Sequence, residues 1–195
     1  MIREIVHYDA PVLRAKGREV PAGPITPAIK QVIEDLFETM RQAHGVGLAA
    51  QQIGEAVQVA VIDVTGIKER PSKMWIKGEP VDPEKFMPLI LINPVIKPTK
   101  TKIIGHEGCL SFPGLTLDIA RAQRVAVKTR SPDGEAFEFD AGGLLGRAVL
   151  HEVDHLHGKL YIDHLSAADR RAIREDLEYI KRGEPIPERP AKDET

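Results

Sequence analysis

The chain has 195 residues, a length that fits one domain and leaves little room for a second. Its composition, 42% hydrophobic and 29% charged, argues against a disordered chain, a coiled coil or a collagen-like rod. The 27 basic and 29 acidic side chains give a net charge of −2 with histidine neutral, so no overall basic field exists to hold nucleic acid or an anionic membrane. We therefore expect no direct nucleic-acid specificity and no membrane partner.

The cysteine content and the first residues indicate a reducing compartment. Cys109 is the single cysteine, so an intrachain disulfide is impossible. No apolar run approaches the roughly 20 residues of a membrane-spanning helix. Residues 1–20 lack the apolar stretch of a signal peptide and contain acidic side chains, which transit peptides avoid. The sequence therefore predicts a cytoplasmic protein.

The first predicted element is a helix. Thr26 is a typical N-cap residue and Pro27 a typical first helical residue, and apolar side chains at helical spacing follow. We expect this helix to end near His44 and Gly45.

Five strands are predicted beyond this helix, at residues 57–64, 88–95, 101–106, 124–130 and 135–140. A Ser-Pro-Asp-Gly sequence joins the last two and predicts a hairpin turn. The first two are separated by a long polar segment, residues 65–87, which holds the single tryptophan, Trp75. A connection of that length is either functional or disordered, and we expect a surface insertion.

Two more helices are predicted, at residues 143–157 and 167–182, the second highly charged. Strands gathered between helices favour an α+β fold, with mostly antiparallel strands packed around a central helix and with an N-terminal and a C-terminal helix. We expect one domain over residues 1–182. Residues 183–195 are rich in proline and charge, which predicts a disordered tail.

The sequence His-Glu-Val-Asp-His at residues 151–155 carries the clearest chemical signal. Residues four apart share a helix face, so His151 and His155 can reach one metal ion. Glu152 is turned by about 100° around the helix and stays free to act as a base. The alternative, a helix with two ordinary surface histidines, is less favoured because an apolar run precedes the motif.

A hydrolytic metal site usually has three protein ligands and one open position, so a third ligand is needed. Neither His157 nor His164 has the spacing found in common zinc proteases. Cys109 is the better candidate, because it lies in the sequence EGCLSFPG, where glycine and proline mark a turn at the end of a strand. The alternative for a lone cysteine is a buried and inert side chain.

A third segment, GVGLAAQQIG at residues 45–54, superficially matches a dinucleotide-binding fingerprint. That fingerprint follows a strand and opens a helix, whereas this segment follows a helix and precedes a strand. Its glycines more simply allow a loop to approach a ligand, with Gln52 supplying an uncharged NH₂ donor.

Taken in this order, GVGLAAQQIG, EGCLSFPG and HEVDHLHG resemble the three signature motifs of the peptide deformylase family. The resemblance implies a central metal-binding helix and removal of the N-formyl group from the initiator methionine of nascent polypeptides, with release of formate. It implies that Cys109, His151 and His155 bind the metal and that Glu152 is the general acid and base. Gln52 and the backbone N–H of Leu110 would hold the oxyanion.

A methionine side chain needs an apolar pocket. The resemblance and the helix face place the following residues at this pocket: Val46, Gly47, Gly108, Leu144, Arg147 and Ala148. Arg147 could cover the pocket with its stem, and Leu144 and Ala148 could equally be ordinary core. Three features depart from the family pattern: Leu150 in place of the usual Gln, Gln51 in place of Thr or Pro, and the length of residues 65–87.

Thiolate and imidazole ligands suit several metals, so the residues alone do not choose one. The resemblance favours Fe²⁺, with Zn²⁺, Ni²⁺ or Co²⁺ as possible substitutes. It also raises contact with the ribosome through the charged C-terminal helix, whose simpler interpretation is a solvated face. Two other functions stay open: a zinc peptidase that cuts internal peptide bonds, and a metal-binding interaction module without activity.

Overall fold

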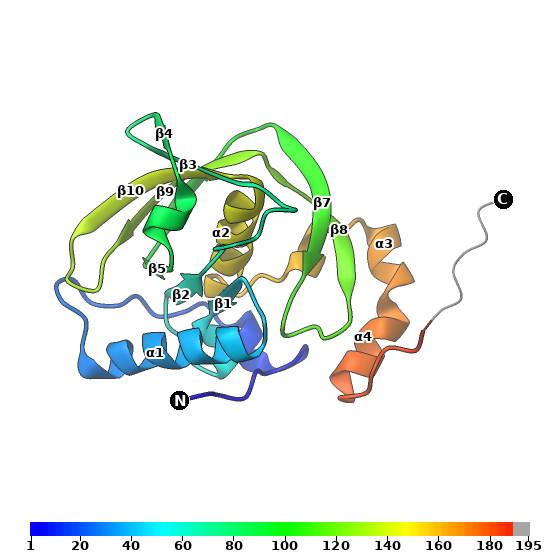
Figure 1. Ribbon diagram of the computed structural model, residues 1–195. Coiled ribbons are helices and arrows are strands. Elements are labelled where there is room, and N and C mark those ends of the chain that lie inside the picture. Colours follow the sequence, from blue (N-terminus) through cyan, green and yellow to red (C-terminus); the bar gives the residue numbers. More distant parts are fainter. Residues whose placement is uncertain (189–195) are drawn as a thin grey trace.

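The computed structural model describes residues 1–188 (Figure 1). Helix α1 spans Pro27–Gln42 and α2 spans Gly143–Leu156, and two shorter helices follow, α3 at Ala167–Ala172 and α4 at Arg174–Lys181. The strands are β1 (Gly47–Ala49), β2 (Val59–Ile62), β3 (Ser72–Ile76), β4 (Glu79–Val81), β5 (Leu89–Ile92), β6 (Val95–Pro98), β7 (Lys102–Gly108), β8 (Thr116–Ala122), β9 (Arg124–Arg130) and β10 (Ala136–Gly142). Within residues 1–188, no helix is long and apolar enough to cross a membrane.

Three antiparallel sheets pack around α2. Their strand orders are β4-β3-β10-β9-β6, β1-β2-β5 and β7-β8. Figure 1 shows α2 in the middle of the molecule, with α1 beneath the sheets and with α3 and α4 beyond the β7–β8 hairpin. The predicted α+β fold is confirmed.

Helix α1 forms as its sequence predicts. The Thr26 hydroxyl accepts a hydrogen bond from the Ile29 N–H at 3.3 Å and so satisfies one of the free donors of the first turn. The buried face of α1, which includes Leu36 and Met40, packs on β1 and β2. The helix ends at Gln42, directly before the loop that lines the candidate site.

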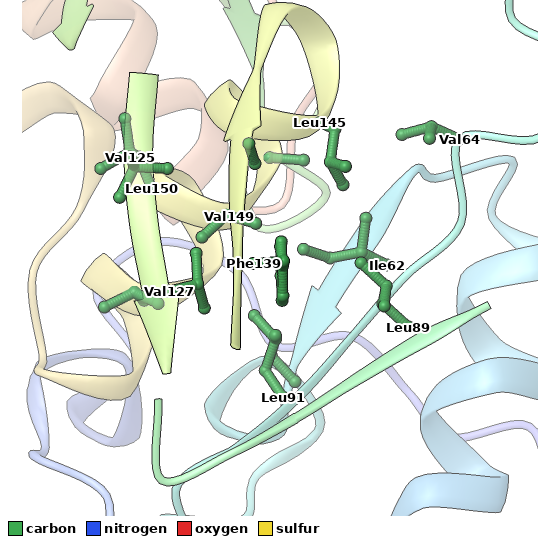
Figure 2. Close-up of a cluster of buried hydrophobic side chains, with 14 of the residues drawn as sticks. Ile62, Val64, Leu89, Leu91, Val125, Val127, Phe139, Leu145, Val149 and Leu150 are labelled. Carbon is green, nitrogen blue, oxygen red and sulfur yellow. The ribbon is translucent and has the colours of Figure 1, made fainter. Parts of the chain in front are cut away.

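Helix α2 is the centre of the main hydrophobic core. Leu145 and Val149 are fully buried, and their side chains lie among those of β2, β5, β9 and β10, including Ile62, Leu91 and Phe139 (Figure 2). Burial of each such side chain contributes about 1.5–3 kcal/mol, so the core holds α2 firmly between the sheets. The C-terminal half of the helix, which carries the histidines, is therefore held in place by the apolar N-terminal half.

The single strand predicted at residues 88–95 is wrong. The chain forms two strands there, β5 and β6, which belong to different sheets. Asn93 lies between them with a positive φ of 47°, and its side chain bonds to the Val20 backbone through Oδ1 at 2.9 Å and Nδ2 at 2.8 Å. A left-handed Asn followed by Pro94 interrupts the extended chain and turns it toward the second sheet.

Residues 65–87 form part of the main sheet, which corrects the prediction of a surface insertion. They contain β3 and β4, and β3 pairs with β10, more than sixty positions away in the chain. Met74 of β3 is buried in the main core. Strand β8, which pairs with β7, was likewise not predicted. Pairings between segments so distant leave little signal in a local pattern.

The C-terminal segment is two helices where one was predicted. The break falls at Ile173, whose φ of −94° and ψ of 5° leave the helical region. Its side chain packs with Leu177 and Ile180 in a second core cluster. No glycine or proline marks this break, so local propensity gave no warning. The tail predicted to be disordered comprises residues 183–195, and residues 189–195 of it lie outside the described residues.

Candidate metal centre

Helix α2 supplies two of the candidate ligands. His151 and His155 lie one turn apart, with ring centroids separated by 5.0 Å, and both are buried. Glu152 is also buried but faces a different direction, against the backbone of β1. The predicted helical spacing of the motif is confirmed.

Cys109 completes the cluster from the turn that follows β7. Its Sγ lies 3.3 Å from Nε2 of His155, and the ligand atoms of Cys109, His151 and His155 all lie within 4.8 Å of one another. A tetrahedral ion with ligand distances of about 2.0–2.3 Å separates its ligand atoms by roughly 3.3–3.8 Å, so a small movement of these side chains would accommodate it. One thiolate and two imidazoles fit Zn²⁺ and Fe²⁺ equally well. The three residues form a site that can bind one metal ion.

The pKa values of the two histidines diverge. Burial alone lowers the pKa of both, but the Cys109 thiol and the Glu107 carboxylate raise that of His151 well above its usual value. For His155, the neighbouring His151 adds to burial and lowers the pKa well below the usual value. His155 is therefore neutral, the form in which imidazole binds a metal.

Glu152 lies against a glycine because no larger residue fits there. A Cβ added to Gly47 would come within 2.3 Å of Oε1 of Glu152. Burial raises the pKa of Glu152 to about 7, and among the described residues no group hydrogen-bonds its Oε2. This carboxyl can therefore gain or lose a proton near neutral pH.

Gln52 faces Cys109 from the short 3-10 helix after β1. Its Oε1 accepts a hydrogen bond from the Ala49 N–H at 2.9 Å, which directs the NH₂ group toward the site. That Nε2 donates to Ser111 Oγ at 3.2 Å and lies 3.5 Å from Cys109 Sγ. The NH₂ donor predicted for this residue is thus placed beside the candidate metal ligands.

A buried carboxylate that the sequence analysis did not select holds His151 in orientation. Oε2 of Glu107 lies 3.1 Å from Nδ1 of His151, and Arg121 makes two bonds to the same carboxylate at 2.9 and 3.0 Å. Burial alone would raise the pKa of Glu107, but His151 and Arg121 lower it to about 2. Glu107 lies near the end of β7, two positions before Cys109, and the period of two along a strand could have suggested that both side chains face the same way. Carboxylate partners of this kind fix the ring of a metal-binding histidine.

Arg121 extends this network to the other side of α2. Its Nη1 bonds to Asp154 and lies 2.8 Å from Nε2 of His164, which in turn lies 2.7 Å from Asp154. These contacts join Arg121 of β8 to Asp154 of α2 and to His164 in the segment after α2.

Arg147 lines the cavity as predicted, but its guanidinium has a structural role as well. It donates to the Glu107 carboxylate at 2.8 Å and to three backbone carbonyls, those of Ile103, Gly105 and Ile119, at 2.8–3.2 Å. A Cβ at Gly105 would come within 2.8 Å of this guanidinium. Arg147 thus attaches the β7–β8 hairpin to α2.

A cavity of about 420 Å³ opens over the site. It is lined by every predicted site residue except His155: Val46, Gly47, Gln52, Gly108, Cys109, Leu110, Leu144, Arg147, Ala148, His151 and Glu152. Leu144 and Ala148 line this cavity and also belong to the main core. Further lining residues that the sequence analysis did not select include Arg70, His106 and Thr116.

Leu150, where the family has Gln, points away from the cavity. It is buried in the main core, and Figure 2 shows it beside Val125 of β9. The Glu107 carboxylate accepts a hydrogen bond from His151 Nδ1, so the ring is held without a contribution from position 150.

The chain was compared with known families and proteins. The family model of polypeptide deformylase matches residues 2–171. The peptide deformylase of Methylacidiphilum infernorum is 51% identical over 186 residues, which cover 95% of this chain and 96% of the relative. That of Opitutus terrae is 37% identical and covers 92% of this chain and 93% of the relative.

Solved structures give the same result. The peptide deformylase of Legionella pneumophila superposes with a TM-score of 0.77 at 34% identity, covering 93% of this chain and 96% of that one. Together with the cluster of Cys109, His151 and His155, these similarities show that the chain belongs to the polypeptide deformylase family.

Proposed function

We propose that the protein removes the N-formyl group from the initiator methionine of nascent polypeptides, with Glu152 as general acid and base. The buried Glu152 carboxyl carries this assignment, because its pKa of about 7 and its unpartnered Oε2 suit proton transfer near neutral pH. Glu152 lines the same cavity as Cys109 and His151, which supports this role.

Cys109, His151 and His155 would hold one divalent ion. Fe²⁺ is favoured by the family resemblance, and Zn²⁺, Ni²⁺ or Co²⁺ would be substitutes with the same ligands. Such an ion supplies Lewis-acid activation of water and of the formyl carbonyl. The Glu107 carboxylate would keep the His151 ring oriented toward the ion.

Proton transfer and stabilisation of the oxyanion are carried out by residues of the chain. Glu152 takes a proton from the attacking water as the water oxygen bonds to the formyl carbon. The Gln52 NH₂ group and the Leu110 N–H stabilise the oxyanion, and one such donor contributes about 3 kcal/mol. Glu152 then passes the proton to the methionine nitrogen as the C–N bond breaks, which leaves formate and a free amino group.

The methionine side chain would enter the apolar part of the cavity. Leu144 and Ala148 of α2 present apolar atoms there, and Val46 and Gly47 contribute the opposite side. Gly108, which has room for a Cβ, and Arg147 complete the proposed substrate-binding set.

The test is formate release from formyl-Met-Ala-amide by iron-loaded protein prepared without oxygen. We expect Glu152→Gln to bind the metal normally but to lower kcat roughly 10²–10⁴-fold, because the proton acceptor is lost. Glu138→Gln, a change of the same kind at a largely exposed carboxylate on β10, should leave the rate unchanged.

The outcomes test the role of Glu152 and the deformylation reaction separately. Wild-type rates in metal-loaded Glu152→Gln would overturn the role of Glu152 and leave the reaction standing. No formate from the metal-loaded wild type, with or without cleavage of internal peptide bonds, would overturn deformylation itself. Cytoplasmic location and ribosome contact through the C-terminal helices stay predictions of the sequence.

A further inference from the structure

The segment before β3 is anchored to the start of α2. The Pro71 carbonyl accepts a hydrogen bond from the Leu144 N–H at 3.2 Å, and Ser72 Oγ accepts one from the Leu145 N–H at 3.2 Å. These bonds satisfy donors that the first turn of a helix leaves free. The residue just before them, Arg70, is therefore carried on backbone attached to the helix that bears the candidate metal ligands.

Arg70 lies at the rim of the cavity. Its side chain is exposed, it lines the same cavity as Glu152 and Cys109, and its Nη2 donates to the His106 carbonyl on β7 at 2.9 Å. A guanidinium has five N–H donors, so most of those of Arg70 stay available to a ligand.

The other charges of the cavity wall are already balanced or buried. Among the described residues that line it, Glu107 is paired with Arg147, and Glu152 is a buried carboxyl. Nδ1 of His106 lies 2.6 Å from Oδ1 of Asp118, so this ring already has an acidic partner. Arg70 makes no ion pair within residues 1–188, and the adjacent Glu69 does not line the cavity.

We propose that Arg70 binds an acidic side chain of the substrate within the two residues that follow the formyl-methionine. This inference rests on the proposed function. A peptide with its formyl group at Glu152 and its methionine against Leu144 must continue outward along the same cavity. A carboxylate on that part of the peptide meets a guanidinium, which forms paired hydrogen bonds with carboxylates.

The test compares formyl-Met-X-Ala-amide and formyl-Met-Ala-X-amide peptides, with X as Glu, Gln or Lys. For at least one position of X, we expect the wild type to have a kcat/KM roughly two- to fivefold higher for Glu than for Gln, as for an exposed ion pair, with the change mainly in KM. The Lys peptide should be the poorest. The preference should shrink at high salt, because exposed charges are screened.

Variants assign the preference to one residue. Arg70→Gln should remove it and Arg70→Glu should reverse it toward the Lys peptide, when each kcat/KM is expressed relative to that of the same variant with formyl-Met-Ala-amide. Lys68→Glu is the matched control, since Lys68 is exposed on the same segment but does not line the cavity, and it should keep the wild-type preference.

Three results would overturn the inference and leave the proposed function standing, provided that formate is still released. The first is equal rates for the Glu, Gln and Lys peptides. The others are a preference for Glu that persists in Arg70→Gln, and one that Lys68→Glu abolishes as fully as Arg70→Gln does. A peptide with a free C-terminal carboxylate serves as a further arm. If only that carboxylate raises kcat/KM, Arg70 recognises a chain end and the proposal for side chains is wrong. Absence of formate from every peptide would instead overturn the proposed function.

Discussion

Two groups of paired charges, one around α2 and one in the segment that follows it, differ mainly in burial. The buried charge cluster consists of Glu107, Arg121, Arg147 and Asp154, and the side chains of Glu107 and Arg121 are each 4% exposed. The exposed charge cluster consists of Arg14, Asp163 and Arg170, whose side chains are 26–46% exposed. Both contain arginine–carboxylate pairs, and the buried cluster hydrogen-bonds directly to a candidate metal ligand, His151.

The contribution of an ion pair to the free energy of unfolding depends mainly on how deeply the pair is buried. Removing one partner of a buried pair leaves an uncompensated charge, which costs about 3–5 kcal/mol, whereas an exposed pair contributes about 0–1 kcal/mol. The buried cluster is thus a rigid support for His151 and the β7–β8 hairpin. The exposed cluster joins the segment after α2 to the chain near Arg14 with little effect on stability.

The largest effect is expected for Glu107→Ala. It leaves Arg121 and Arg147 buried without their shared carboxylate and frees the His151 ring, so the free energy of unfolding should fall by about 3–5 kcal/mol and metal affinity by roughly 10–100-fold. Urea unfolding of the metal-free protein and metal titration measure the two effects. A cost no larger than that of Asp163→Ala would refute the contrast between the clusters.

Acid should act mainly through the buried cluster. The pKa of Glu107 is lowered from 4.5 to about 2, so its ionised form stabilises the folded state above about pH 4.5, and this contribution is lost as the pH falls toward 2. The shift corresponds to about 3 kcal/mol. Unfolding free energies of the metal-free protein between pH 2 and 6 should show this slope in the wild type and not in Glu107→Gln.

For Asp163, the same experiment should show a weaker slope of the same sign. Burial alone would raise its pKa, but Arg14 and the Leu160 N–H lower it. Its stabilising contribution is therefore also lost on acidification, and Asp163→Asn should remove it. The slope of unfolding free energy against pH should flatten more in Glu107→Gln than in Asp163→Asn. The reverse order would contradict the ranking of the two carboxylates.

Arg147→Met should be the next largest change. Methionine keeps most of the apolar stem, but the carbonyls of Ile103, Gly105 and Ile119 lose their donor, and we expect a loss of about 2–3 kcal/mol in unfolding free energy. Arg170→Met, the matched change in the exposed cluster, should cost far less. Faster amide hydrogen exchange confined to β7 and β8 would identify the detached hairpin.

The smallest effect is expected for Arg14→Gln. Although Arg14 forms two hydrogen bonds to Asp163, both side chains are partly exposed, so the variant should lose less than about 1 kcal/mol. The difference from wild type should shrink in 0.5 M salt. A loss above 2 kcal/mol that salt does not change would show that this pair acts like a buried one.

Much of the site could be predicted because its chemistry is local. The spacing of His151, Glu152 and His155 along one helix determines which of them share a face. Helix α1 and the β9–β10 hairpin were also predictable, since an N-cap with proline and a Ser-Pro-Asp-Gly turn act over a few residues.

Other features of the site required the fold. The main-chain carbonyls that Arg147 binds lie 28–44 positions away in sequence, so its residue type alone suggested only a pocket wall. The place of Arg70 depends likewise on the pairing of β3 with β10 and on the bonds from Pro71 and Ser72 to α2.

The sequence by itself determined the α+β class, the three motifs and the residue types that could bind a metal, because helix periodicity, turns and ligand spacing are short-range properties. Only the tertiary structure decided that residues 65–87 join the main sheet, that the terminal helix divides at Ile173, and that Glu107 supports His151. Strand pairing and burial depend on contacts between distant segments, and burial sets the strength and the pKa of every charge in the site.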